Sequence, residues 1–187
     1  MPKATRSLPS LLALAALPAA FVANPAAALD LKPDGVFAYV GNAEHSTAAT
    51  GAGLLWDWDW RRDGRFLLTA HTEVQVAAWR TDDFDGGQQD YWHATVLPFL
   101  RVRPSQGKSP FFLDVGIGVS YMDRIYNTPH KTFSTKWNFY DMLGLGYSFG
   151  SRFHNEIAVR YVHLSNGGYR KPNPGENFVQ VRYAHRF

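Results

Sequence analysis

Hydrophobic and polar residues alternate along most of the chain beyond residue 34, and no 3.6-residue period is sustained. The clearest stretch is 51–60, where Leu54, Trp56 and Trp58 share one parity and Asp57 has the other. Successive side chains of a strand point to opposite faces, so this pattern predicts strands with one apolar and one polar face. Eight such strands are predicted, near 35–42, 51–60, 66–79, 91–103, 110–121, 136–149, 153–165 and in a last segment ending at Phe187.

The predicted connections differ in length. Short turns are expected at 61–65, 104–109 and 150–152, and longer polar loops near 42–50, 81–90, 123–134 and 166–176. Short turns, longer loops and an even strand number are typical of outer-membrane barrels. Small residues on the polar faces, such as Gly116 and Gly144, suit a narrow, filled interior. The sequence therefore predicts an all-β fold, an eight-stranded antiparallel outer-membrane β-barrel over residues 29–187.

Alternation alone also fits a soluble lipocalin-like barrel or a β-sandwich, in which the apolar face points inward. Two features of the mature chain favour the membrane. Aromatic residues make up 15% of the chain, and such side chains concentrate at membrane–water interfaces. The chain also ends on Phe187, with Val181 and Tyr183 on the same parity, an ending that looks like the C-terminal insertion signal of bacterial outer-membrane barrels.

The first residues are typical of a secretory signal peptide. Lys3 and Arg6 precede an apolar run, and residues 26–28 are all alanine, so we expect a signal peptide over 1–28. Its removal lowers the formal net charge from +3 to +1. With no Lys/Arg run elsewhere, the sequence predicts no nucleic-acid partner. The absence of cysteine excludes disulfides, thiol nucleophiles and cysteine-ligated metals.

Charged residues of the inward parity are expected to form an ion-pair network that fills the lumen, because buried charges must be paired. They are Asp57, Asp59, His71, Glu73, Asp114, Glu156, Arg160, Arg182 and Arg186. His71 and Glu73 are two residues apart, but no third histidine shares their layer. A zinc site there is therefore a weak hypothesis, and we expect no metal and no cofactor.

His163 and Ser165 break the apolar, lipid-facing parity of the strand over 153–165. Residues two apart on a strand point the same way, so the imidazole and the hydroxyl can meet. They would then form the base–nucleophile pair of acyl transfer. A histidine and a serine two apart are common, however, so on this pair alone two interfacial side chains at a strand end are the simpler interpretation.

Two stretches around this pair narrow the choice: Arg160-Tyr161-Val162-His163-Leu164-Ser165-Asn166-Gly167-Gly168 and Lys171-Pro172-Asn173-Pro174-Gly175. Together they resemble the lipid A 3-O-deacylase (PagL) family, whose signature is His-x-Ser-Asn at a strand end followed by a Pro-Asn-x-Gly loop. The close match covers roughly 160–177, and elsewhere the resemblance is architectural. It implies a cofactor-free serine esterase of the bacterial outer membrane. Such an enzyme hydrolyses the acyl ester at position 3 of lipid A from the outer leaflet.

By this resemblance Ser165 is the nucleophile, His163 the general base and Asn173 a helper of the oxyanion. The family's third member is a glutamate, which falls on Asn177 here, while the nearby glutamate is Glu176. Asn177 has the lipid-facing parity and Glu176 the opposite one. We therefore expect Asn177 to orient His163, with Glu176 as the alternative. Antiparallel pairing around the 166–176 loop predicts Ser165 opposite Asn177, with His163 diagonal to it.

The implied partners are lipid A, or lipopolysaccharide, and the outer membrane, and a homodimer stays open. Phosphates of lipid A are expected to pair with loop cations, for which the candidates are Arg124, Lys131, Lys136, Arg170 and Lys171. Two other functions stay open at this point. One is a non-catalytic structural or interaction barrel, because fold does not give function. The other is a different outer-membrane lipid hydrolase or an acyltransferase.

Overall fold

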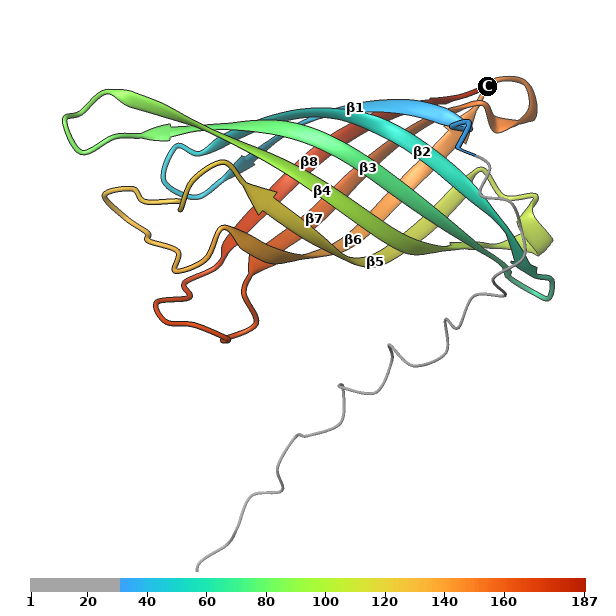
Figure 1. Ribbon diagram of the computed structural model, residues 1–187. Coiled ribbons are helices and arrows are strands. Elements are labelled where there is room, and N and C mark those ends of the chain that lie inside the picture. Colours follow the sequence, from blue (N-terminus) through green and yellow to red (C-terminus); the bar gives the residue numbers. More distant parts are fainter. Residues whose placement is uncertain (1–30) are drawn as a thin grey trace, which may run out of the picture. The chain divides into compact units, whose positions relative to one another are not determined.

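The computed structural model describes residues 31–187, which form a closed antiparallel barrel in which each strand pairs with the next and β8 pairs with β1 (Figure 1). The predicted eight-stranded antiparallel barrel is thereby confirmed. The expected signal peptide lies outside the described residues and stays a prediction. The strands are β1 (Gly35–Ala43), β2 (Ala48–Arg62), β3 (Leu67–Asp82), β4 (Gln88–Arg103), β5 (Phe111–Met122), β6 (Trp137–Phe149), β7 (Asn155–Ser165) and β8 (Glu176–Arg186).

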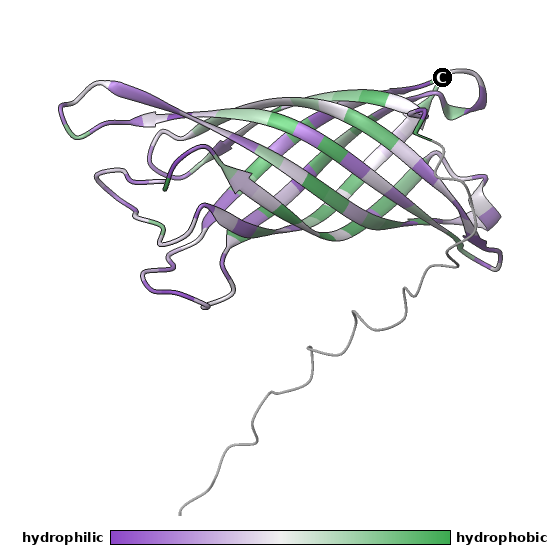
Figure 2. Cartoon of the chain, in the orientation of Figure 1, coloured by the Kyte–Doolittle hydropathy of each residue, from purple (hydrophilic) through white to green (hydrophobic). Residues whose placement is uncertain are grey.

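The outer face of the barrel is apolar. Val40, Ile117 and Leu145 point outward and are 60%, 65% and 67% exposed. Hydrophobic and hydrophilic residues alternate along the strands in Figure 2, while the loops are mostly hydrophilic. A soluble barrel would bury its large apolar side chains, whereas a bilayer provides an apolar solvent for them. Among residues 31–187, no helix is long and apolar enough to cross a membrane.

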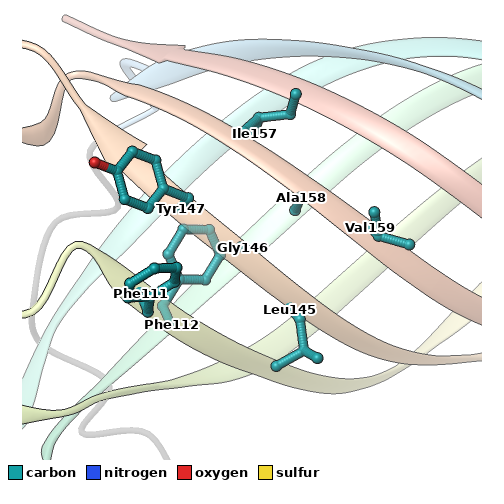
Figure 3. Close-up of a pocket in the computed structure, with 8 residues that line it drawn as sticks. All are labelled: Phe111, Phe112, Leu145, Gly146, Tyr147, Ile157, Ala158 and Val159. Atoms are coloured by element: carbon teal, nitrogen blue, oxygen red, sulfur yellow. The ribbon is translucent and has the colours of Figure 1, made fainter.

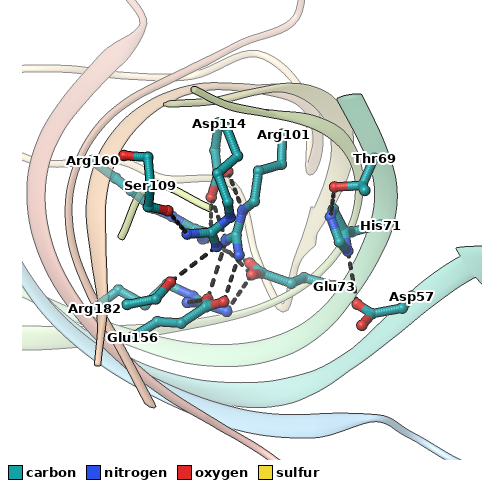
Figure 4. Close-up of polar contacts among 12 residues, drawn as sticks. Asp57, Thr69, His71, Glu73, Arg101, Ser109, Asp114, Glu156, Arg160 and Arg182 are labelled. Carbon is teal, nitrogen blue, oxygen red and sulfur yellow. Dashed lines mark hydrogen bonds and ion pairs between the residues drawn. The ribbon is translucent and has the colours of Figure 1, made fainter. Parts of the chain in front are cut away.

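The lumen is filled by a buried network of ion pairs (Figure 4). Glu73 accepts hydrogen bonds from Arg160 at 2.7 Å and from Arg182 at 2.6 Å. In the same network, Arg101 pairs with Asp114 at 2.8 Å and with Glu156 at 2.5 Å. Each buried charge in this group faces a charge of opposite sign, which offsets the cost of removing it from water.

The predicted network needs two corrections: one residue is removed from it and one is added. Asp59 is exposed and takes no part in it, because β2 runs to Arg62 whereas β1 begins at Gly35, opposite Leu55. The end of β2 therefore projects beyond the barrel rim. Arg101, which the sequence-based set omitted, lies at the centre of the network. Its inward parity on β4 was visible in the sequence, but its ion-pair partners come from strands distant along the chain.

His71 and Glu73, the residues of the weak zinc hypothesis, are bound to other side chains in the structure. Both ring nitrogens of His71 are engaged, one by Asp57 at 2.7 Å and one by the Thr69 hydroxyl at 2.7 Å. Glu73 is held by two arginines. Within the described part of the chain, no three His, Cys, Asp or Glu side chains gather in a way that could hold a metal ion.

The connections at one end of the barrel differ from the expected lengths. Residues 42–50 and 81–90 are largely strand, which leaves only 44–47 and 83–87 as turns. The β3–β4 hairpin keeps its pairing out to Asp82 and Gln88, and two hydrogen bonds from Arg80 to Asp90, of 2.8 and 3.0 Å, cross it. The segments 123–136 and 166–175 are long loops as expected.

A buried contact fixes the 123–136 loop to the start of β8. Lys131 Nζ lies 2.8 Å from Glu176 Oε1, and the Tyr126 hydroxyl donates to Glu176 Oε2 at 3.2 Å. Burial raises the pKa of Tyr126 to about 12, so its hydroxyl stays protonated and can donate. Glu176 is therefore an inward-facing structural residue. The same strand start carries Asn177 on its outer face.

Candidate active site

The candidate site lies on the outer surface of the barrel, at the long-loop end of β6, β7 and β8. His163 and Ser165 are half-buried on the outward face at the end of β7, while Leu164 between them is fully buried in the lumen. On β6, Asp141 is the backbone partner of His163, and Phe139 is that of Ser165. The site is thus built on three paired strands, which fixes the positions of its side chains.

Asn177 is the side chain that holds the imidazole. His163 Nδ1 lies 2.7 Å from Asn177 Oδ1. An amide oxygen can only accept, so this contact places the ring proton on Nδ1 and leaves Nε2 free to act as a base. Glu176, the alternative, points into the lumen and is 1% exposed.

The register differs from the expected one. Asn177 lies opposite His163, whereas the sequence predicted it opposite Ser165. The β7–β8 ladder ends at the pair Leu164 and Glu176. The pairing of β7 with β8 is therefore shifted by two residues from the expected one, and Ser165 lies beyond the end of the ladder, without a strand partner on β8. The direct pairing brings the amide closer to the imidazole than the diagonal arrangement would.

Gly175 covers one edge of the imidazole. Its φ of 70° is a left-handed conformation that favours glycine. A Cβ atom there would lie 2.7 Å from His163 Cε1, which is closer than carbon atoms can approach. Sequence reasoning saw this glycine only as part of a motif. Its position two residues before Asn177 was the only feature of the sequence that could have indicated a contact with the imidazole.

Ser165 and His163 share one face, but no hydrogen bond joins them within residues 31–187. The Ser165 hydroxyl instead accepts a long bond of 3.4 Å from the Gly167 backbone N–H. Bonds between a nucleophile and its base are often long until a substrate binds. The imidazole and the hydroxyl therefore occupy neighbouring outward positions, and the Gly167 N–H is already directed at the hydroxyl oxygen.

Asn173 is positioned by the residue that follows Ser165. Its Oδ1 accepts a 3.1 Å bond from the Asn166 backbone N–H. The Nδ2 group of Asn173 has no partner in the part of the chain that the structure describes, and it is the end of the amide that can donate. The loop itself is anchored, because Asn166 Nδ2 donates to Ser134 Oγ at 3.0 Å and to the Arg170 carbonyl at 2.9 Å.

Asp141 is a candidate functional residue to which the sequence reasoning gave no role. Its carboxylate is half-buried on the lipid-facing side beside His163. It forms no hydrogen bond or ion pair with another described residue. The signal was present in the sequence, since Asp141 interrupts the apolar parity of 136–149. What the sequence lacked was the β6–β7 register that places it next to His163.

Of the five candidate loop cations, three already have partners in the protein and two do not. Lys131 is paired with Glu176, and Lys136 Nζ donates to the Asp123 carbonyl at 2.7 Å. Arg124 pairs with the Asp123 carboxylate at 3.0 Å. Arg170 and Lys171 are exposed on the 166–175 loop, and their side chains bind no other described residue. These two are the cations free to meet an anionic ligand beside Ser165.

An apolar groove of about 460 Å³ also lies on the outer surface (Figure 3). None of the residues that line it belongs to this site. Its walls include Tyr147 on β6 and Ile157 and Val159 on β7. Val159 is six positions from Ser165, about 20 Å at roughly 3.3 Å per residue. The groove therefore lies toward the short-turn end of the barrel.

Comparison with known proteins identifies the family and the fold of this chain. The family model for lipid A 3-O-deacylase (PagL) matches residues 47–186. The lipid A deacylase PagL of Pseudomonas aeruginosa is 30% identical over 180 residues, covering 95% of this chain and 97% of that protein. The lipid A deacylase PagL of Bordetella bronchiseptica is also 30% identical, over 66% of this chain, and the alignment spans 65% of that relative's length.

The fold has a counterpart among solved structures. The crystal structure of the outer membrane enzyme PagL superimposes with a TM-score of 0.69 at 23% sequence identity, covering 82% of this chain and 99% of that one. This likeness identifies the fold as that of an eight-stranded outer-membrane β-barrel. The family match covers well over half of the residues. The chain belongs to the lipid A 3-O-deacylase (PagL) family.

Proposed function

We propose that this protein is a serine esterase of the bacterial outer membrane that hydrolyses the 3-O-linked acyl chain of lipid A. The observation that carries the proposal is the contact of His163 with Asn177, next to Ser165, on the lipid-facing surface. An oriented base beside a hydroxyl suits ester hydrolysis. Family membership supports lipid A as the substrate.

In this mechanism the Ser165 hydroxyl attacks the acyl carbonyl carbon, and His163 Nε2 takes its proton. The developing oxyanion accepts hydrogen bonds from Asn173 Nδ2 and the Gly167 N–H. As the tetrahedral intermediate collapses, His163 returns the proton to the 3-oxygen of the sugar, which leaves as an alcohol. Water, deprotonated by His163, then attacks the acyl-enzyme and releases the fatty acid. These steps require no metal and no cofactor.

A Ser-His-Asn arrangement orients the imidazole but adds no charge to stabilise the imidazolium. Asp141 lies on the other side of His163 and carries a carboxylate with no other partner among the described residues. A negative charge within about 4–6 Å of an imidazole favours its protonated form. We infer that Asp141 supplies the charge, while Asn177 supplies the orientation.

The site faces the outer leaflet in this proposal. Both long loops, 123–136 and 166–175, lie at the end of the barrel that carries Ser165. In outer-membrane barrels the longer loops are extracellular and the short turns periplasmic. Lipid A belongs to the outer leaflet. The scissile ester would thus meet Ser165 at the depth where headgroup and acyl chains join.

The test is to incubate the purified, folded protein with lipopolysaccharide and to measure the mass of the lipid A. We expect the loss of one 3-hydroxy fatty acid from position 3, and no loss with Ser165→Ala. Heat-modifiable migration in gels would establish that both proteins are folded. Unchanged lipid A with folded wild-type protein would contradict the proposal. Parallel analysis of phospholipids would reveal a phospholipase or an acyltransferase instead.

A further inference from the structure

Three aromatic rings form a continuous row beside Ser165, and the proposed chemistry uses none of them. Phe139 is the backbone partner of Ser165. Trp137 packs edge-on against it, with ring centroids 5.7 Å apart at 88°. Tyr169 follows, 5.5 Å from Trp137 at 52°. We call Phe139, Trp137 and Tyr169 the aromatic shelf. It runs from the nucleophile toward the loops.

The outer part of the shelf lies in water or at the lipid headgroups, not in the protein core. Tyr169 is 78% exposed, yet its loop is anchored. The Tyr169 N–H donates to the Asn166 carbonyl at 3.1 Å, and Asn166 is in turn bonded to Ser134. A large ring on an anchored, exposed loop gains little from solvent. Its apolar surface is removed from water, with a gain in free energy, only when a ligand covers it.

Charge lies next to the rings. Arg170 and Lys171 directly follow Tyr169, and both are exposed with side chains that bind no other described residue. From the bilayer outward, the site therefore offers an apolar strand surface, a nucleophile, aromatic faces and then free cations. A phosphorylated glycolipid has its groups in the same order: acyl chains, an ester, sugar rings and phosphates.

We propose that the aromatic shelf binds the sugar backbone of lipid A, with a glucosamine ring on Trp137 and Tyr169 and a phosphate at Arg170 and Lys171. The C–H groups of a sugar ring carry partial positive charge, and the face of an aromatic ring is negative, so the two attract. Guanidinium and ammonium groups bind phosphate by charge-assisted hydrogen bonds. The inference rests on the proposed function and adds the element that selects a glycolipid over a simple ester.

Aromatic residues also gather at membrane interfaces without binding any specific ligand. The chain offers matched controls for that role. Trp92, on β4 at the same end of the barrel, points outward and is 58% exposed, and Phe84, in the β3–β4 turn, is 64% exposed. Neither belongs to the shelf. Trp92→Ala and Phe84→Ala remove comparable exposed rings away from Ser165.

The first measurement is binding, made in the Ser165→Ala background so that no turnover is needed. Lipopolysaccharide is titrated into the folded protein in detergent. We expect Trp137→Ala and Tyr169→Ala each to raise the Kd at least tenfold, and the controls Trp92→Ala and Phe84→Ala to change it less than twofold. Equal effects at shelf and control positions, or no effect at the shelf, would overturn the proposal. This binding measurement tests the aromatic shelf even if the protein proves not to be an esterase.

The second measurement is selectivity, made with an active Ser165. The kcat/KM for lipopolysaccharide is compared with that for a long-chain p-nitrophenyl ester, which has an acyl chain but no sugar. Each shelf variant should lower the ratio of the two values at least tenfold, mainly through KM for lipopolysaccharide. A parallel fall on both substrates would mean that the rings only support the fold or Ser165, and would overturn the proposal. Absence of turnover on both substrates in the wild type would instead contradict the esterase function.

Discussion

In the proposed mechanism, Asn177 is an uncharged residue in a position where a carboxylate would serve the reaction better. Its amide oxygen fixes the imidazole of His163 at 2.7 Å, but it does not stabilise the positive charge that forms during acyl transfer. We expect Asn177→Ala to lower the kcat for lipid A deacylation about 10²–10⁴-fold, because the imidazole loses its orientation. Asn177→Glu should match or exceed the wild type.

Glu176→Gln is the matched control for that series. Glu176 faces the lumen and binds Lys131 and Tyr126. The glutamine side chain has the same shape as the glutamate but carries no charge. Activity should stay within a few fold of the wild type. If Glu176→Gln abolished deacylation and Asn177→Ala did not, the inward carboxylate would be the third member of the site.

Asp141 is the carboxylate beside His163 on β6. If it supplies the charge that Asn177 lacks, Asp141→Asn should lower kcat about tenfold or more in the wild-type background. In the Asn177→Glu background, where the glutamate already faces the imidazolium, the same change should cost much less. Coupled residues give such non-additive cycles. A loss of equal size in both backgrounds would mean that Asp141 acts on the substrate and not through the charge of His163.

At the scale of elements, the turn that leads into β8 sets the position of the imidazole. Gly175 and Gly168 both have a positive φ, of 70° and 82°, so an alanine strains the backbone at either position. Only at Gly175 would the added Cβ also meet His163, at 2.7 Å, whereas nothing lies within 4 Å at Gly168.

We therefore expect Gly175→Ala to lower deacylation at least tenfold more than Gly168→Ala does, with both variants folded. The measurement is kcat with lipopolysaccharide, beside heat-modifiable migration as a test of folding. Equal losses would mean that backbone strain alone matters and that the contact with the imidazole does not.

The strands and their faces could be predicted from the sequence, because the period of two is local. The positions of Leu164 and Glu176 in the lumen follow from the same parity. The turns at 44–47 and 83–87 could not be predicted. Polar residues extend a hairpin when cross-strand bonds such as that of Arg80 with Asp90 support them, and these bonds depend on register.

Register also limits what could be predicted of the site. The motif places His163 and Ser165 on the outer face, but the partner of Asn177 depends on the register of β7 and β8, which the loop conformation sets. The contact of Asp141 with the site depends on the pairing of β6 with β7. The anchoring of Asn173 by the Asn166 N–H involves two loop residues, for which the sequence shows no periodic pattern.

For the whole molecule, the barrel supports a site on its outside, and its inside is filled. The buried pairs of Glu73, Arg160 and Arg182 occupy the lumen (Figure 4). The two long loops at one end are linked to each other by the hydrogen bond from Asn166 Nδ2 to Ser134 Oγ. In the proposed mechanism the substrate therefore approaches Ser165 from the lipid phase and not through the barrel.

The orientation of the barrel in the membrane can be tested because the chain contains no cysteine, so a single introduced thiol is the only target. Lys171→Cys lies on the 166–175 loop and Lys108→Cys on the 104–110 turn, and both positions are exposed. A membrane-impermeant maleimide should label Lys171→Cys on intact cells and Lys108→Cys only after lysis. The reverse pattern would place the site on the periplasmic side.

Covalent labelling tests directly whether Ser165 is the nucleophile. A long-chain fluorophosphonate reacts with a serine that an adjacent base activates, and the adduct can be mapped by mass spectrometry. We predict one adduct per chain, on Ser165, with complete loss of lipid A deacylation, and no adduct in His163→Ala. Deacylation that continues in fully labelled protein, or an adduct on another residue, would contradict the assignment of Ser165 as the nucleophile.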